Sequence, residues 1–152
     1  MRRQILIEEL DEVHSECERL LQTGYTMNGK WTLGQMCRHL RLTIDANVDG
    51  YPRWMTIVGF PIRLFARQLM LPKLLRGQSP AGLPTAPAYV PPSGLDDANE
   101  VALLRSSIER YLKHRDRLHP HPGFGRLTPD LFDRFHAAHA SHHLSFLDPK
   151  AA

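Results

Sequence analysis

Cysteine is scarce in this chain, which has only Cys17 and Cys37 among its 152 residues. The two lie in separate predicted helices and do not form a Cys-x-x-Cys pair. The sequence therefore argues against a disulfide framework and against a cysteine-based zinc site. We expect both side chains to be small buried apolar groups, the common role of free cysteine in a folded core.

Long apolar runs are also missing. The longest segment of membrane character, residues 54–62, is far shorter than the ~20 apolar residues that span a bilayer. The first residues are basic, but acidic residues follow almost at once and no apolar run of signal-peptide length comes after them. We predict no transmembrane segment and a cytoplasmic protein.

Neither sign of charge dominates the composition. The chain has 19 Lys and Arg against 16 Asp and Glu, for a formal net charge of +3, and the basic residues are scattered. A nucleic-acid-binding surface needs clustered cations. We therefore expect no nucleic-acid partner.

No segment alternates apolar and polar residues as a strand does, whereas apolar residues recur at helical spacing in several segments. The predicted helices cover residues 5–21, 32–48, 61–71, 96–114 and 128–147. Residues 72–94 are rich in Pro and Gly and lack periodicity, which predicts a long loop that covers something. The pattern predicts an all-α fold in a single domain over residues 1–152, a four-helix bundle with an extra short helix and a long crossover loop.

Two predicted helix starts have clear capping signals. Thr32 with Gln35 three residues later forms a capping box. Thr128 followed by Pro129 gives an N-cap and a proline at the first helical position. Residues 119–125, just before, predict a rigid turn.

Four of the nine histidines lie within residues 135–143, on the last predicted helix. Residues four apart on a helix stand ~5–6 Å apart, so His139 and His143 can hold one metal ion between them. A zinc-protease helix would also need Glu directly after the first His. Ala140 occupies that position, which excludes that mechanism.

A third donor is available on the second predicted helix, where His39 is the only histidine. It stands beside Met36 and Thr43 at the edge of the apolar stripe and can point into the bundle, as ligands of bundle metal sites do. From spacing alone, a metal site and a set of ordinary polar histidines remain equally open.

Other polar residues near this cluster have weaker signals. His136, one turn below His139, is a candidate for supporting a ligand or contacting a substrate. His142 does not lie on the helix face that His136, His139 and His143 share. The nearest polar candidates on the second helix, Gln35, Asp45 and Asn47, are expected to be surface or capping residues.

Residues 31–40, which run from a Trp-Thr pair to His39 and Leu40, resemble the second-helix signature of the DinB/YfiT-like superfamily of metal-dependent four-helix proteins. Residues 119–147 resemble an uncharacterised bacterial branch of that superfamily. The resemblance implies a metal triad of His39, His139 and His143. One departure is that many relatives continue from the last histidine into Arg-Gly-Gln, where this chain has Leu144, Ser145 and Phe146.

Three protein ligands with open coordination positions are typical of catalytic rather than structural metal sites. Imidazole ligands suit a divalent transition metal such as zinc or nickel. The resemblance implies a hydrolase or a transferase that uses a low-molecular-weight thiol, acting on a small molecule of unknown identity. The sequence does not identify catalytic residues, because it contains no recognisable set of a nucleophile, a base and a group that orients the base.

Two alternatives remain open, a non-enzymatic metal-binding protein and a structural or interaction bundle. The first would have the triad without an adjoining pocket, and the second would leave the histidines apart. Arg63, Arg67, Lys73 and Arg76 near the start of the 72–94 loop are either solvated surface charges or a site for an anionic substrate. Trp54 and Phe60 suggest a further use of this region, a homodimer contact.

Overall fold

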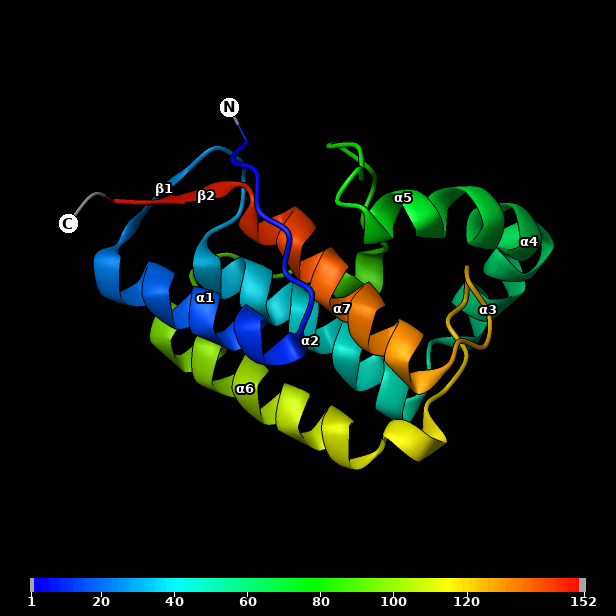
Figure 1. Ribbon diagram of the computed structural model, residues 1–152. Helices are drawn as coiled ribbons and strands as arrows, with labels where there is room; N and C mark the ends of the chain where they lie inside the picture. The colour runs from blue at the N-terminus through cyan, green and yellow to red at the C-terminus, as the bar shows by residue number, and fades with distance from the viewer. Residues whose placement is uncertain (1, 151–152) are drawn as a thin grey trace.

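The computed structural model describes residues 2–150 and is mostly helical (Figure 1). The α-helices are α1 (Leu10–Thr23), α2 (Leu33–Asp49), α3 (Arg53–Gly59), α4 (Arg63–Phe65), α5 (Leu71–Leu75), α6 (Asp97–Lys113) and α7 (Pro129–Leu144). Short 3-10 turns occupy Phe60–Ile62, Pro87–Tyr89 and Arg115–Arg117, and a π-helical turn occupies Ala66–Met70. The all-α prediction is confirmed.

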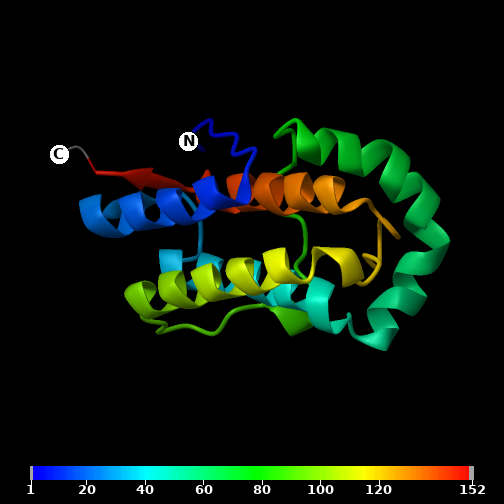
Figure 2. The same cartoon turned by 60° about the horizontal axis from the view of Figure 1, so that its bottom comes forward.

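The four long helices form the bundle, with α1 and α7 in one layer and α2 and α6 in the other (Figure 2). Their apolar stripes meet in one core. Its most deeply buried members include Leu20, Leu33, Leu40, Leu104, Tyr111 and Leu144. Both cysteines are free and buried in this core, as predicted, with their sulfur atoms 3.8 Å apart. Among the described residues, no helix combines the length and apolar character that crossing a bilayer requires.

The first helix starts later than predicted, at Leu10 rather than at residue 5. The preceding residues run in an extended conformation beside α7. Ile7 is buried there and its backbone N–H donates to Ser141 Oγ at 2.7 Å, while the N–H of Arg3 donates to the carbonyl of Ser145. Apolar spacing alone could not distinguish this packed strand-like segment from a first helical turn.

The last helix ends earlier than predicted, at Leu144, because the chain after it forms a strand. Strand β2 (Leu147–Pro149) pairs antiparallel with β1 (Tyr25–Met27), with Thr26 opposite Asp148. Each strand is three residues long. That is too short to give a visible alternation in the sequence.

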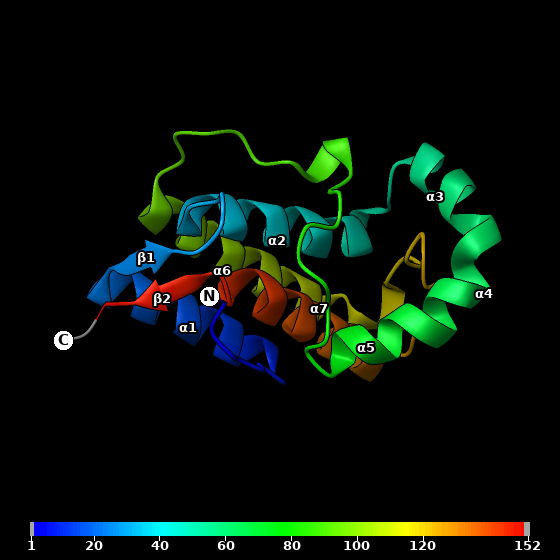
Figure 3. The ribbon, with the colours of Figure 1, turned by 90° about the horizontal axis from the view of Figure 1, so that it is seen from above.

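The predicted short helix of residues 61–71 is part of a longer helical arch, residues 53–75 (Figure 3). Pro61 and Pro72 do not interrupt it, because each lies in the first turn of its segment, where the missing N–H has no helical partner. The Pro/Gly-rich loop therefore begins after Leu75 rather than at Pro72, and it contains the 3-10 turn Pro87–Tyr89.

Both predicted caps are confirmed. Thr32 and Gln35 bond each other's backbone in a capping box, and the Thr128 side chain accepts the N–H of Leu131. The predicted turn before α7 is closed by two backbone hydrogen bonds between His121 and Gly125, and Gly125 has a φ of 74° that favours glycine.

A buried asparagine joins this turn to the bundle. Asn47, which we expected at the surface or at a cap, is fully buried near the end of α2. Its Nδ2 donates to the carbonyl of His119 at 2.7 Å, and its Oδ1 accepts from His136 Nε2 at 3.0 Å. Its buried position was not visible in the sequence, because both partners come from the other end of the chain.

We expect Asn47→Ala to destabilise the fold by about 1–3 kcal/mol, because it leaves the buried Nε2 of His136 without a partner and removes the hydrogen bond to the His119 carbonyl. Urea denaturation would measure the change. Asn99→Ala, at an exposed position on α6, is the matched control and should have a much smaller effect. Equal stability of the two variants would contradict the role assigned to Asn47.

Candidate metal centre

Three histidines converge between α2 and α7. His39 lies on α2, and His139 and His143 lie one turn apart on α7. The Nε2 atom of His139 is 3.2 Å from Nε2 of His39 and 3.1 Å from Nε2 of His143. All three ligand atoms lie within 4.8 Å of one another, so the group can hold a metal ion.

These separations suit a tetrahedral ion. Nitrogen ligands at ~2.0–2.1 Å from zinc are themselves ~3.3 Å apart in tetrahedral geometry. The two Nε2–Nε2 distances are close to that value. Three imidazoles leave at least one coordination position for water or substrate.

The protonation state of His39 also suits a ligand. Its Nδ1 lies 2.8 Å from the backbone carbonyl of Tyr89. A carbonyl oxygen only accepts, so Nδ1 carries the proton and Nε2 presents its lone pair to the centre. A backbone carbonyl behind a ligand histidine is the usual way to fix the tautomer and the ring direction.

Aromatic side chains fix the other two rings. Trp31 stacks on His143 with ring centroids 5.5 Å apart, and Phe135 stacks on His139 at 5.9 Å. The buried Nδ1 of His139 has no hydrogen-bond partner among the described residues. Stacking by Phe135 therefore helps to orient this ring, because no partner holds its Nδ1.

Burial keeps the three imidazoles neutral. Desolvation lowers the pKa of His39, and it lowers the pKa of His139 and His143 well below the usual range, with a further contribution from the neighbouring histidines. Neutral rings have the lone pairs that a metal requires. A cation would stabilise rings that present their Nε2 lone pairs to this shared desolvated point, as His39 does.

A cavity of about 630 Å³ adjoins the three histidines. Most of its wall is apolar and comes from the arch, the 76–94 loop, the turn before α7 and α7 itself. Representative lining residues are Met55, Phe65, Leu69, Leu83, Phe124 and Phe135. The loop thus covers something, as predicted, and Lys73 lies at the cavity.

The basic residues near the loop have different positions. Arg63 and Arg67 donate to the carbonyls of Pro122 and Arg126 in the turn before α7, and so hold the arch against that turn. They do not line the cavity, whereas Lys73 does. Arg76 is exposed.

His121 is a cavity residue that the sequence analysis treated only as part of a turn. Its Nδ1 accepts the backbone N–H groups of Gly123 and Phe124 at 3.0 and 3.1 Å. Nε2 must then carry the proton, and it has no partner among the described residues. Burial lowers the pKa of His121 to about 4, so it is a neutral hydrogen-bond donor at the cavity wall.

The remaining candidates lie elsewhere. His136 is buried beneath the site against Asn47 and Tyr111, and it does not line the cavity. Asp45 accepts from Ser107 on α6, and Gln35 completes the capping box. The structure brings none of these three to the histidine group.

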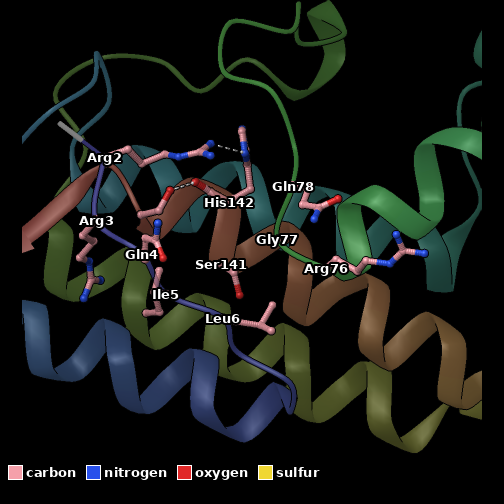
Figure 4. Close-up of a pocket in the computed structure, with 11 residues that line it drawn as sticks. Arg2, Arg3, Gln4, Ile5, Leu6, Arg76, Gly77, Gln78, Ser141 and His142 are labelled. Carbon is pink, nitrogen blue, oxygen red and sulfur yellow. Dashed lines mark hydrogen bonds between the residues drawn. The ribbon is translucent and has the colours of Figure 1, made fainter.

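His142 separates the cavity from a second hollow on the other side of α7, and it lines both. Figure 4 shows this hollow, with Arg2 close to the His142 ring, 3.3 Å from its Nδ1. Arg3 and Arg76 also line it, but His39, His139 and His143 do not. The second hollow is thus separate from the three-histidine group.

Comparison with protein families gives one match, to the family described as "Protein of unknown function (DUF1569)", over residues 1–150. The chain belongs to the DUF1569 family. Comparison with curated proteins and with solved structures finds no match. Membership of the DinB/YfiT-like superfamily stays a prediction for this DUF1569 protein.

Acid should destabilise this DUF1569 protein through its buried neutral histidines. Burial lowers the pKa of His136 to about 3 and that of His121 to about 4, against ~6.5 in an unfolded chain. As the pH falls below ~6.5, these histidines bind protons in the unfolded chain but stay neutral in the folded chain, so the free energy of unfolding falls. Each such histidine contributes up to about 1.4 kcal/mol per pH unit.

Urea denaturation of the metal-free protein at pH 7.5 and at pH 5 would measure this loss. The variant His136→Gln should show a smaller pH dependence than the parent, because one of the buried histidines is gone. A free energy of unfolding that does not change between the two pH values would contradict the prediction.

Proposed function

We propose that this protein is a metal-dependent enzyme that holds one divalent transition metal ion, zinc or nickel, on His39, His139 and His143. Its reaction is a hydrolysis or a transfer to a low-molecular-weight thiol, and its substrate is a small, mainly apolar molecule. The observation that carries the proposal is the apolar cavity next to the three histidines.

This juxtaposition discriminates between the classes left open by the sequence. In a purely structural bundle, three neutral imidazoles around one point would cost free energy of desolvation without a compensating ligand. A metal-storage or structural metal site has no need of an adjoining cavity and usually completes four protein ligands. An incomplete ligand set beside a large cavity favours catalysis.

An ion at this site would supply Lewis-acid activation of a water, a thiol or a substrate oxygen. The chain's own residues account for the rest of the arrangement. The Tyr89 carbonyl, Trp31 and Phe135 keep the three rings in their ligand orientation. The loop and the arch form much of the wall of the cavity that the reaction would use.

The cavity wall also suggests how substrate is oriented. The apolar side chains bind the body of the molecule through the hydrophobic effect. His121 Nε2–H is a donor of fixed tautomer for a substrate oxygen. Lys73 is the cationic side chain of the lining and favours a substrate with a negative or electron-rich end.

Metal analysis of the purified protein tests the proposal first. We expect about one ion per chain in the parent and none in His139→Ala, which should keep the same helical circular dichroism because Phe132 and Phe135 still anchor α7 by apolar burial. His14→Ala, on α1, is the matched control and should retain the ion. Zinc at about 100 times its Kd should raise the free energy of unfolding by about 2.7 kcal/mol in the parent and the control only.

An absence of stoichiometric metal in the parent would contradict the proposed function. Unfolding of the parent on metal removal would instead indicate a bundle held together by its ion.

Alkyl hydroxamates test whether the cavity and the metal form one site. The hydroxamate group binds a metal ion, and its alkyl chain would lie in the apolar cavity. From acetohydroxamate to octanohydroxamate we expect affinity for the zinc-loaded protein to rise by up to about fourfold per methylene. Calorimetry would measure it, and equal affinity along the series would show that the cavity does not receive ligands of the ion.

A further inference from the structure

The arch of residues 53–75 carries large apolar side chains on its outer surface. Six of them are 54–71 % exposed: Ile57, Val58, Phe60, Ile62, Leu64 and Phe65. Figures 1 and 3 show the arch beyond one end of the bundle, beside the turn before α7. Exposed apolar side chains concentrated in one short segment indicate an interaction or membrane surface.

The arch is nevertheless packed firmly against the rest of the protein. On the inner side, Ala66 and Leu71 are buried, and Arg63 and Arg67 bond the carbonyls of the turn before α7. A Cβ at Gly59 would overlap the backbone of Pro122, so the two segments are in close contact there. The outer apolar side is therefore held away from the protein.

The charge within this segment has one sign. Residues 50–95 contain no Asp or Glu and five basic residues, Arg53, Arg63, Arg67, Lys73 and Arg76. Arg53, Lys73 and Arg76 form no ion pair among residues 2–150. The chain as a whole is nearly balanced, so this segment is distinct from the rest.

We propose that the arch docks onto an anionic lipid bilayer and lies in its interface, with the apolar side chains among the acyl chains and the basic ones at the headgroups. Helices that lie on membranes combine exposed Trp, Phe and Leu with Lys and Arg. Trp54, 48 % exposed near the start of the arch, fits the headgroup level that Trp prefers.

A second copy of the chain fits this surface less well. A symmetric dimer brings the same patch of both partners together. Two arches would then bring their basic residues together with no acidic residue of either arch to pair them. An anionic bilayer supplies the missing negative charge and also the apolar phase.

The docked orientation has a consequence for the cavity. Phe65, Leu69 and Met70 line the cavity and are also 42–62 % exposed. They therefore lie at its mouth, on the side that would face the lipid. An apolar molecule dissolved in the bilayer could enter there, whereas the docking itself does not depend on the metal.

Vesicle flotation tests the docking with the intact protein. We expect binding to phosphatidylcholine vesicles that contain phosphatidylglycerol, little binding to phosphatidylcholine alone, and weakening by salt. Trp54 fluorescence should shift to the blue on binding, and Trp54→Phe should lose that shift.

Two variants separate the apolar from the ionic contribution. Ile57→Ser with Leu64→Ser should lower the partition coefficient at least about tenfold, and Arg53→Gln with Arg76→Gln roughly 30-fold. Matched controls on α6, Leu103→Ser with Leu112→Ser and Arg105→Gln with Lys113→Gln, should leave binding unchanged. Circular dichroism would verify that each variant is folded.

Three outcomes would overturn the proposal. The first is no binding of the parent to anionic vesicles. The second is binding that the Ile57 and Leu64 substitutions do not change, which would indicate adsorption by charge alone. The third is a dimer in light scattering that these substitutions dissociate, together with no vesicle binding, which would assign the surface to a second copy.

Discussion

Three uncharged imidazole rings share one desolvated space between α2 and α7, and the organisation around the site follows from that constraint. Nitrogen lone pairs at such short separations repel one another unless a proton or a cation lies between them. Burial disfavours a charged imidazolium, as the lowered pKa values of His39, His139 and His143 indicate, whereas a neutral ring can still donate an Nε2 proton to its neighbour. A metal ion at the shared point would take the place of that proton, and the three histidines could hold one.

The surroundings of the site support it at two levels. Close to the rings, Trp31, Phe135 and the Tyr89 carbonyl hold their orientation. Farther out, Asn47 ties α2 to His136 on α7 and to the turn before α7. That turn positions His121 at the cavity wall and accepts hydrogen bonds from the arch. The metal-binding histidines, the cavity wall and the arch are thus linked by a continuous set of contacts.

The arch has two faces with different roles. Its inner face closes the cavity beside the three histidines, and its outer face presents apolar and basic side chains that the protein itself does not cover. The mouth of the cavity lies on the surface proposed to meet the lipid. In the proposed function, an apolar substrate would therefore pass from the bilayer at the outer face to the histidines behind the inner face. The proposed catalysis and the proposed docking are separable, since the first depends on the imidazoles and the second on side chains outside the ligand set.

Local patterns in the sequence determined the four long helices apart from some of their ends, two of their caps, the turn before α7 and the pairing of His139 with His143, because each depends on residues within one or two helical turns. They also determined that α2 offers a histidine on its inner side. Other features needed the tertiary structure. Residues 2–7 are not helical because the side chain of Ser141 on α7 and the carbonyl of Ser145, just after α7, accept their backbone N–H groups, and the end of α7 is fixed by pairing between β1 and β2. The burial of Asn47 could not be predicted from local patterns, because its hydrogen-bond partners lie more than seventy residues away in the sequence. The cavity and the exposed side of the arch depend on how segments distant in sequence pack, which helical periodicity, a property of one segment at a time, cannot specify.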